Sequence, residues 1–220
     1  MSPEDAGSTC PLCRRRASER FFEDARRVYL RCDGCGLVFV PERYWLSLEE
    51  EKAVYDLHRN DPVDPGYRRF VSRLSIPLVN RLGPSRQGLD FGCGPGPALS
   101  RILEEQGHRV ALYDPFYHND EGVVMKARTY DFICATEVVE HLRDPAHEFE
   151  ALFNMLRADG WLGIMTKLLI DREAFRSWHY IRDPTHICFF SRTTFEYLAR
   201  RFEADVEFVG KDVILLHKRP

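Results

Sequence analysis

The stretch Gln87–Gly96, QGLDFGCGPG, decides the fold of this chain. It begins as a short apolar run that contains one acid, which is typical of the end of a buried strand, and glycine then occupies every second position. Glycine allows a backbone to pass very close to a ligand, and Pro97 is well suited to the first turn of a helix. A strand, a glycine loop and a helix in this order predict a cradle for a nucleotide-like cofactor, because free backbone N–H groups and a helix N-terminus favour an electron-rich ligand.

The spacing of these glycines separates two classes of cofactor. The dinucleotide fingerprint GxGxxG needs glycine at its sixth position. That position holds Pro97 when counted from Gly92 and Leu99 when counted from Gly94. From residue 90 the loop instead has the form DxGxGxG, which resembles the first motif of class I S-adenosylmethionine-dependent methyltransferases. The resemblance implies that the loop binds this cofactor through Asp90, Gly92, Cys93, Gly94 and Gly96. A glycine turn without a ligand is the alternative.

A second acid follows at an interval that suits the ribose of an adenosine. The apolar run Val110–Tyr113 predicts another buried strand, and Asp114 follows it, 20 residues after Gly94. At this interval a carboxylate can accept hydrogen bonds from both ribose hydroxyls. Pro115 and Phe116 come next, where an apolar side chain could pack on the adenine. The methyltransferase resemblance implies cofactor binding by these three residues.

The segment Tyr130–Leu142, YDFICATEVVEHL, carries a second likeness. It resembles the fourth motif of the methyltransferase branch that includes quinone-biosynthesis O-methyltransferases and many sugar and small-molecule methyltransferases. Thr136 and Glu137 leave the predicted strand at its carboxyl edge, where open α/β sheets hold ligands, and are expected to contact the cofactor. Three interpretations are open for Glu137, Glu140 and His141, which share one face of a helical turn. They bind a divalent cation, or His141 is a general base assisted by Glu140, or Glu140 and His141 fix the loop by hydrogen bonds.

Two further segments are expected to complete the site. The stretch 176–191, RSWHYIRDPTHICFFS, resembles the insertion that lines the acceptor pocket in many enzymes of this branch, and His186 is its candidate catalytic residue. A histidine with satisfied hydrogen bonds and no catalytic role is the alternative. Ser47 and Glu50 predict a capping box for a helix that carries Tyr55 and His58 on one face. These two side chains are expected to close over the cofactor, or else to pack against the core.

Four of the seven cysteines predict a metal site in the first 40 residues. Cys10, Cys13, Cys32 and Cys35 have the spacing C-x2-C-x18-C-x2-C, which is typical of a tetrahedral zinc site with four thiolates. A redox dithiol is the alternative. Residues 14–31 also contain seven arginines and three acids, a basic stretch that nucleic acid could contact. The favoured interpretation is a solvated charged surface on a structural ribbon, since the net charge of the whole chain is −3.

These patterns predict an α/β protein with a three-layer α/β/α, Rossmann-like methyltransferase fold. A seven-stranded, mostly parallel sheet with one antiparallel strand is expected, ending in a hairpin of residues 206–209 and 213–216. Only fifteen residues separate Asp114 from Tyr130, so the third strand is expected to be truncated near residues 123–125 or reduced to coil. Three segments are predicted: a zinc ribbon (1–42), a linking helix or lid (43–61) and the S-adenosylmethionine-dependent methyltransferase domain (62–220).

The predicted function is methyl transfer from S-adenosylmethionine to an oxygen, nitrogen or carbon of a small-molecule acceptor, such as a sugar or a quinol. An RNA methyltransferase that docks nucleic acid through the ribbon is one alternative, and a non-catalytic binding module with the same fold is another. No apolar run approaches the roughly 20 residues needed to cross a bilayer, and the N-terminus lacks a signal-peptide pattern, so a cytoplasmic protein without membrane insertion is expected.

Overall fold

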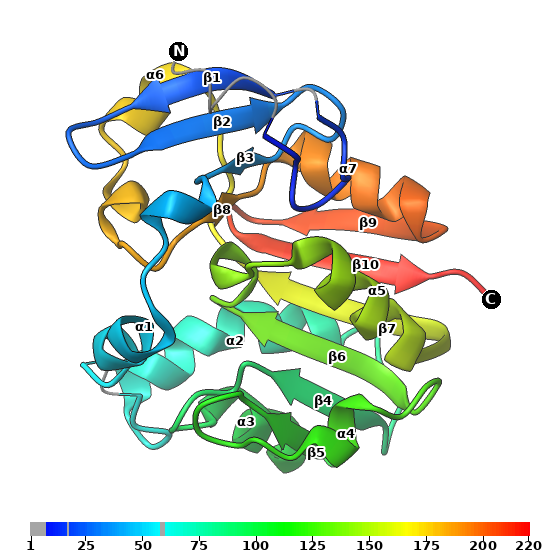
Figure 1. Ribbon diagram of the computed structural model, residues 1–220. Helices are drawn as coiled ribbons and strands as arrows, with labels where there is room; N and C mark the ends of the chain where they lie inside the picture. The colour runs from blue at the N-terminus through cyan, green and yellow to red at the C-terminus, as the bar shows by residue number, and fades with distance from the viewer. Residues whose placement is uncertain (1–7, 17, 58–59) are drawn as a thin grey trace.

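The computed structural model describes residues 8–16, 18–57 and 60–220 and contains two sheets (Figure 1). The larger sheet has the strand order β5-β4-β6-β7-β10-β9. Its strands are β4 (Gln87–Phe91), β5 (Arg109–Tyr113), β6 (Tyr130–Thr136), β7 (Leu156–Met165), β9 (Ala204–Val209) and β10 (Val213–Lys218). Strands β5, β4, β6 and β7 pair in parallel, and β10 is antiparallel to both β7 and β9. The expected class and the terminal hairpin are therefore confirmed.

Helices cover both faces of this sheet and make three layers (Figure 1). On one face α2 (Pro65–Val79) and α3 (Ala98–Glu105) pack on alternate residues of the strands, including Phe132 and Leu215. On the other face α5 (Pro145–Met155) and α7 (Arg192–Arg201) pack on the residues between them, such as Ile133 and Leu216. Side chains alternate along a strand, so a sheet covered on both sides is apolar throughout.

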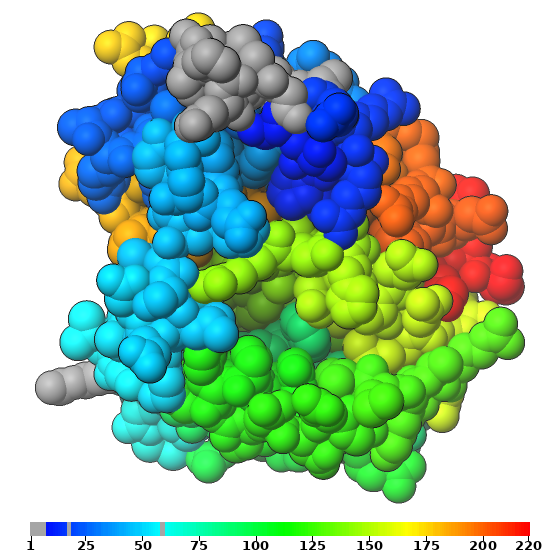
Figure 2. Space-filling model, in the orientation of Figure 1, coloured from blue at the N-terminus to red at the C-terminus, as the bar shows by residue number. Residues whose placement is uncertain are grey.

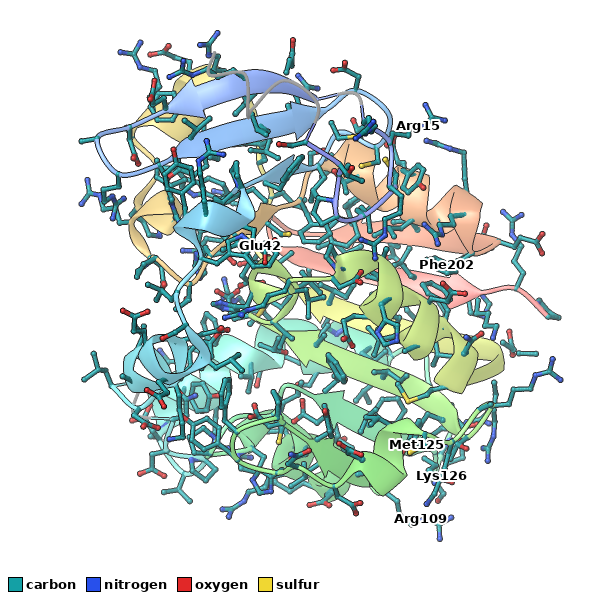
Figure 3. The ribbon with its side chains drawn as sticks, viewed as in Figure 1. Arg15, Glu42, Arg109, Met125, Lys126 and Phe202 are labelled. Atoms are coloured by element: carbon teal, nitrogen blue, oxygen red, sulfur yellow. The ribbon has the colours of Figure 1, made fainter. Side chains whose placement is uncertain are left out.

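The expectation of seven strands was wrong, because no third crossover strand forms. Residues 121–124 form the short helix α4 (Glu121–Val124) instead. A parallel crossover alone takes about a dozen residues and a strand about five more, so the fifteen residues after Asp114 do not suffice. Strand β5 is consequently an edge strand, and the exposed Arg109, Met125 and Lys126 lie at this end of the molecule, far from Arg15 at the other end (Figure 3).

The smaller sheet joins the N-terminal segment to a distant part of the chain. It has the order β1-β2-β3-β8, with β1 (Ser18–Glu23), β2 (Val28–Cys32), β3 (Val38–Phe39) and β8 (Cys188–Phe189). Phe175, in α6 (Arg172–Arg176), lies at ring-centroid distances of 5.3 Å from Phe21 and 5.0 Å from Tyr29. The apolar core of the ribbon is therefore shared with the segment after β7.

Three short 3-10 helices and one α-helix lie around the site. They are η1 (Glu42–Tyr44), α1 (Leu48–Tyr55), η2 (Val139–His141) and η3 (His179–Arg182). Helix α1 begins with the expected capping box between Ser47 and Glu50. No helix in the described part of the chain is both long and apolar enough to cross a membrane.

Candidate cofactor and acceptor site

A cavity of about 640 Å³ lies at the carboxyl ends of the parallel strands, below α1. Figure 2 shows the surface hollowed between the light-blue N-terminal segment and the green segments. Eleven of the predicted site residues line this cavity: Tyr55, Gly92, Cys93, Gly94, Asp114, Pro115, Phe116, Thr136, Glu137, His141 and His186. Three others, Asp90, Gly96 and Glu140, are not among the lining residues. His58 lies outside the described residues.

The glycine loop after β4 needs glycine for two separate reasons. Gly92 and Gly94 have φ angles of +72° and +63°, in the left-handed region that side chains disfavour. At Gly96 a Cβ atom would lie only 1.6 Å from the carbonyl oxygen of Asn60. Asp90 is fully buried behind the loop, and this burial raises its pKa to about 7. Its carboxyl group interacts with the backbone of Ser100 in α3 and does not line the cavity.

Asp114 is a hydrogen-bonding centre for the loops on both sides of it. Its Oδ2 accepts a hydrogen bond from the Gly94 N–H at 2.9 Å, and its Oδ1 accepts from the N–H groups of Phe116 at 2.9 Å and Tyr117 at 3.1 Å. A carboxylate has about four lone-pair sites, so further acceptor capacity remains. This arrangement is compatible with ribose hydroxyls as additional donors.

Thr136 and Glu137 present the cavity with buried oxygen atoms that lack a protein partner. Thr136 Oγ1 and Glu137 Oε1 make no hydrogen bond within the described structure. Glu137 also has a φ of +52°, and burial together with the charge of Glu140 raises its pKa to about 8. An unpaired buried polar atom costs about 1–3 kcal/mol, so these atoms indicate a ligand that supplies the missing partners. The donor groups of S-adenosylmethionine fit this requirement.

Helix α1 is held over the cavity by several side chains. The Tyr55 ring lies edge-on to Phe116 at 5.7 Å and to His141 at 5.3 Å. The Tyr55 hydroxyl donates to Glu51 at 2.7 Å, and Glu51 forms an ion pair with Arg143 at 2.8 Å. Tyr55 thus lies between Phe116, in the loop after β5, and His141.

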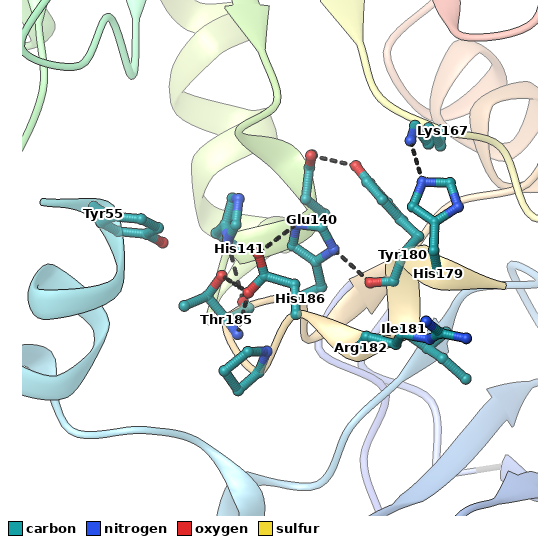
Figure 4. Close-up of polar contacts among 12 residues, drawn as sticks. Tyr55, Glu140, His141, Lys167, His179, Tyr180, Ile181, Arg182, Thr185 and His186 are labelled. Carbon is teal, nitrogen blue, oxygen red and sulfur yellow. Dashed lines mark hydrogen bonds and ion pairs between the residues drawn. The ribbon is translucent and has the colours of Figure 1, made fainter. Parts of the chain in front are cut away.

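His141 and His186 lie together although they are 45 positions apart in the sequence (Figure 4). Their ring centroids are 4.8 Å apart. Nδ1 of His141 lies 3.2 Å from the carbonyl oxygen of Thr185, and Nδ1 of His186 lies 2.7 Å from that of Tyr180. A carbonyl only accepts hydrogen bonds, so Nδ1 carries the proton in each ring, and in the neutral form Nε2 carries none. Nε2 of His186 lies 3.8 Å from Asp183 Oδ2. Burial lowers the pKa of both imidazoles, which favours this neutral form.

Glu140 is fully buried and already hydrogen-bonded through both oxygens. Its Oε1 accepts from the Tyr180 hydroxyl (Figure 4), and its Oε2 accepts from Thr166 Oγ1 at 3.0 Å. This geometry fits the interpretation in which Glu140 fixes the loop. Ligand atoms of Glu140, His141 and His186 lie within 4.8 Å of one another and could hold a cation. The sequence had suggested Glu137 in this set, and in the structure His186 takes its place.

Comparison with known proteins identifies the family. The profile of a methyltransferase domain matches residues 65–207, which is more than half of the chain. The chain belongs to this methyltransferase family. The fold is that of the class I S-adenosylmethionine-dependent enzymes. Among curated proteins no match was found.

Solved structures share the fold of this methyltransferase at low sequence identity. A SAM-dependent methyltransferase from Archaeoglobus fulgidus is 17% identical with a TM-score of 0.54, covering 69% of this chain and 94% of its own. The 1,6-didemethyltoxoflavin-N1-methyltransferase of Burkholderia thailandensis, solved with 1,6-didemethyltoxoflavin and S-adenosylhomocysteine bound, is 18% identical with a TM-score of 0.51. That match covers 92% of this chain and 100% of the other.

The four predicted zinc ligands of the methyltransferase come together at one end of its ribbon. The Sγ atoms of Cys10 and Cys35 are 3.6 Å apart, and those of Cys13 and Cys32 are 3.3 Å apart. All four sulfurs lie within 4.8 Å of one another. A tetrahedral site with Zn–S bonds of about 2.3 Å has S–S edges of about 3.8 Å, so the cluster fits zinc with slight expansion.

The polar residues of the cavity wall that were not predicted as site residues from the sequence include Lys167, His179 and Asp183. Lys167 follows β7, and its Nζ lies 2.6 Å from His179 Nε2, while Asp183 lies on the segment that carries His186. Lys167 could have been found, since it follows a strand at the same carboxyl edge as Thr136. His179 and Asp183 are placed by a loop whose path does not follow from local spacing.

Proposed function

We propose that this methyltransferase methylates an oxygen, nitrogen or carbon atom of a small polar acceptor, bound beside His141 and His186. The observation that carries the proposal is that two imidazoles, each with Nδ1 held by a backbone carbonyl, line the same cavity as the glycine loop and the unpartnered oxygens of Thr136 and Glu137. The toxoflavin-type ligand of the Burkholderia enzyme supports an acceptor of small-molecule size. The likeness to quinone-biosynthesis O-methyltransferases and the division at residues 42 and 62 stay predictions, as does a cytoplasmic location.

The chain's own residues divide the work of this reaction. S-adenosylmethionine, when bound, supplies an electrophilic methyl group on a positively charged sulfur. Asp114 holds the ribose, Thr136 and Glu137 accept hydrogen bonds from the methionine part, and Tyr55 with Phe116 excludes water. An imidazole Nε2 takes the acceptor proton if the nucleophile carries one. Positioning of the acceptor supplies most of the rate, and no covalent bond to the protein is needed.

Calorimetry with S-adenosylhomocysteine tests the cofactor claim. We expect binding heat from the wild type and at least about tenfold weaker binding for Asp114→Asn, because the amide group keeps only one of the two carboxylate oxygens. Asp205→Asn is the matched control, since Asp205 forms an ion pair with Arg219 on the surface and lies outside the cavity, so the variant should leave affinity unchanged. Absence of binding heat from the wild type would overturn the proposal.

We also propose that Cys10, Cys13, Cys32 and Cys35 bind one structural zinc ion. Metal analysis should find about one zinc per chain, and Cys32→Ser should lose it, because removing one thiolate opens the closed four-sulfur site. Cys93→Ser is the control, since Cys93 lies in the cofactor loop and should retain the metal. A folded wild-type protein without zinc would refute this assignment.

Two alternatives are less well supported by the contacts. Nucleic-acid docking through the ribbon would use free arginines, but Arg14 pairs with Asp144, while Arg26 and Arg27 donate to backbone carbonyls of residues 181–184. Binding of RNA that weakens steeply with salt would favour this alternative.

A divalent cation at Glu140, His141 and His186 would be favoured if adding Mg²⁺ or Mn²⁺ to dialysed protein raises turnover.

A further inference from the structure

Arg27 is a buried cation that belongs to the ribbon but contacts the wall of the acceptor cavity. It follows the turn between β1 and β2 and is only 5% exposed. Its Nη2 donates hydrogen bonds to the carbonyl oxygens of Ile181 and Asp183, both at 2.9 Å, and its Nη1 donates to that of Pro184 at 3.2 Å. Its Nε donates to the Tyr29 hydroxyl at 2.9 Å.

These contacts satisfy a charge that would otherwise be costly to bury. A guanidinium removed from water is tolerated only where its N–H groups find partners. The carbonyls of residues 181–184 lie at and after the C-terminal end of η3, where partial negative charge collects and a cation is favourable. Arg27 therefore stabilises one backbone path for this segment through several hydrogen bonds at once.

The same segment orients both candidate bases. The Tyr180 carbonyl accepts the Nδ1 proton of His186, and the Thr185 carbonyl accepts that of His141. In sequence these two carbonyls directly flank the three that Arg27 holds. A shift of the segment would release the Nδ1 protons and let each imidazole adopt the other tautomer, with its proton on Nε2 and no free electron pair there.

We infer that Arg27 is a positioning residue, through which the ribbon sets the tautomer and orientation of His141 and His186. The ribbon thereby acts on the acceptor half of the site. The cofactor half is held separately, because the hydrogen bond between Gly94 and Asp114 joins the loops after β4 and β5, which Arg27 does not contact in the described structure. The positioning itself is independent of the proposed function, and only its effect on catalysis rests on that proposal.

Nitrogen NMR of the histidine rings, made without cofactor or acceptor, tests the inference. In the wild type both rings should show the tautomer with hydrogen on Nδ1. In Arg27→Met both signals should shift to a mixture of tautomers, while affinity for S-adenosylhomocysteine by calorimetry stays within about twofold. Arg31→Met is the control, because Arg31 is an exposed arginine of the same hairpin and should change neither measurement.

A second pair of variants separates positioning from general damage to the fold. Arg27→Lys keeps the charge without the planar fork, so it should fold and still show mixed tautomers. In Arg27→Ala, methylguanidinium at millimolar concentration should restore the Nδ1 tautomers by occupying the vacated space. Two results would overturn the inference: wild-type tautomers in Arg27→Lys, or a loss of S-adenosylhomocysteine affinity in Arg27→Lys that accompanies the change of tautomers. Absence of cofactor binding by the wild type would instead defeat the proposed function. It would leave the inference on Arg27 standing, because the ring signals are measured without cofactor.

Discussion

Gly96→Ala should weaken binding of S-adenosylhomocysteine by at least about a hundredfold, equivalent to about 2.8 kcal/mol. The added Cβ would lie 1.6 Å from the carbonyl oxygen of Asn60 and 2.7 Å from its carbonyl carbon. Both of these atoms belong to the backbone, so no rotation of a side chain relieves the overlap. Either the segment around Asn60 or the glycine loop must move, and Asn60 and the loop both line the cofactor cavity.

A second glycine provides the control for this substitution. Gly107 has a φ of +86°, yet a Cβ there would have no neighbour within 4 Å. Gly107→Ala should therefore cost about 1–2 kcal/mol of folding stability from left-handed strain and leave the calorimetric affinity unchanged. If Gly96→Ala binds S-adenosylhomocysteine as tightly as Gly107→Ala does, the close approach of Asn60 to the loop is not part of the binding site.

His141→Ala should lower turnover by about 10²- to 10⁴-fold while changing S-adenosylhomocysteine affinity by less than about threefold. The imidazole lines the cavity, and in the proposed function it acts on the acceptor, whereas other residues hold the cofactor. Burial lowers the pKa of His141, so in the wild type the free base persists below the usual value of about 6.5. Activity should accordingly fall only as the pH drops below about 6.5. The measurement is the rate of S-adenosylhomocysteine formation with an acceptor found by screening polar small molecules.

His147→Ala is the matched control, because that side chain is 74% exposed and lies outside the cavity. It should leave both turnover and its pH profile unchanged. A fully active His141→Ala variant would show that this imidazole serves only to hold its loop, which was one of the interpretations that the sequence left open.

Local spacing was enough to predict most residues that line the proposed cofactor half of the cavity, although Asp90 and Gly96 do not line it. The strand, the glycine loop and Asp114 lie within one strand–helix–strand unit, where the number of intervening residues sets which groups meet. The clustering of the four cysteines was predictable for the same reason, because each pair lies within one tight turn. The prediction of seven strands was wrong because the interval after Asp114 is too short for a crossover and a further strand, and helix α4 forms there.

The acceptor half depends on contacts between residues far apart in the chain. Pairing of β3 with β8 draws residues 188–189 into the ribbon sheet, and backbone hydrogen bonds of this kind leave no mark in the side-chain pattern. The same packing brings His186 to His141 and turns Arg27, one of seven arginines in a stretch that read as solvated, into a buried anchor. Residue spacing thus predicts the proposed methyl-donor site, whereas the part of the cavity wall that we propose contacts the acceptor forms only once the ribbon and the segment after β7 have packed together.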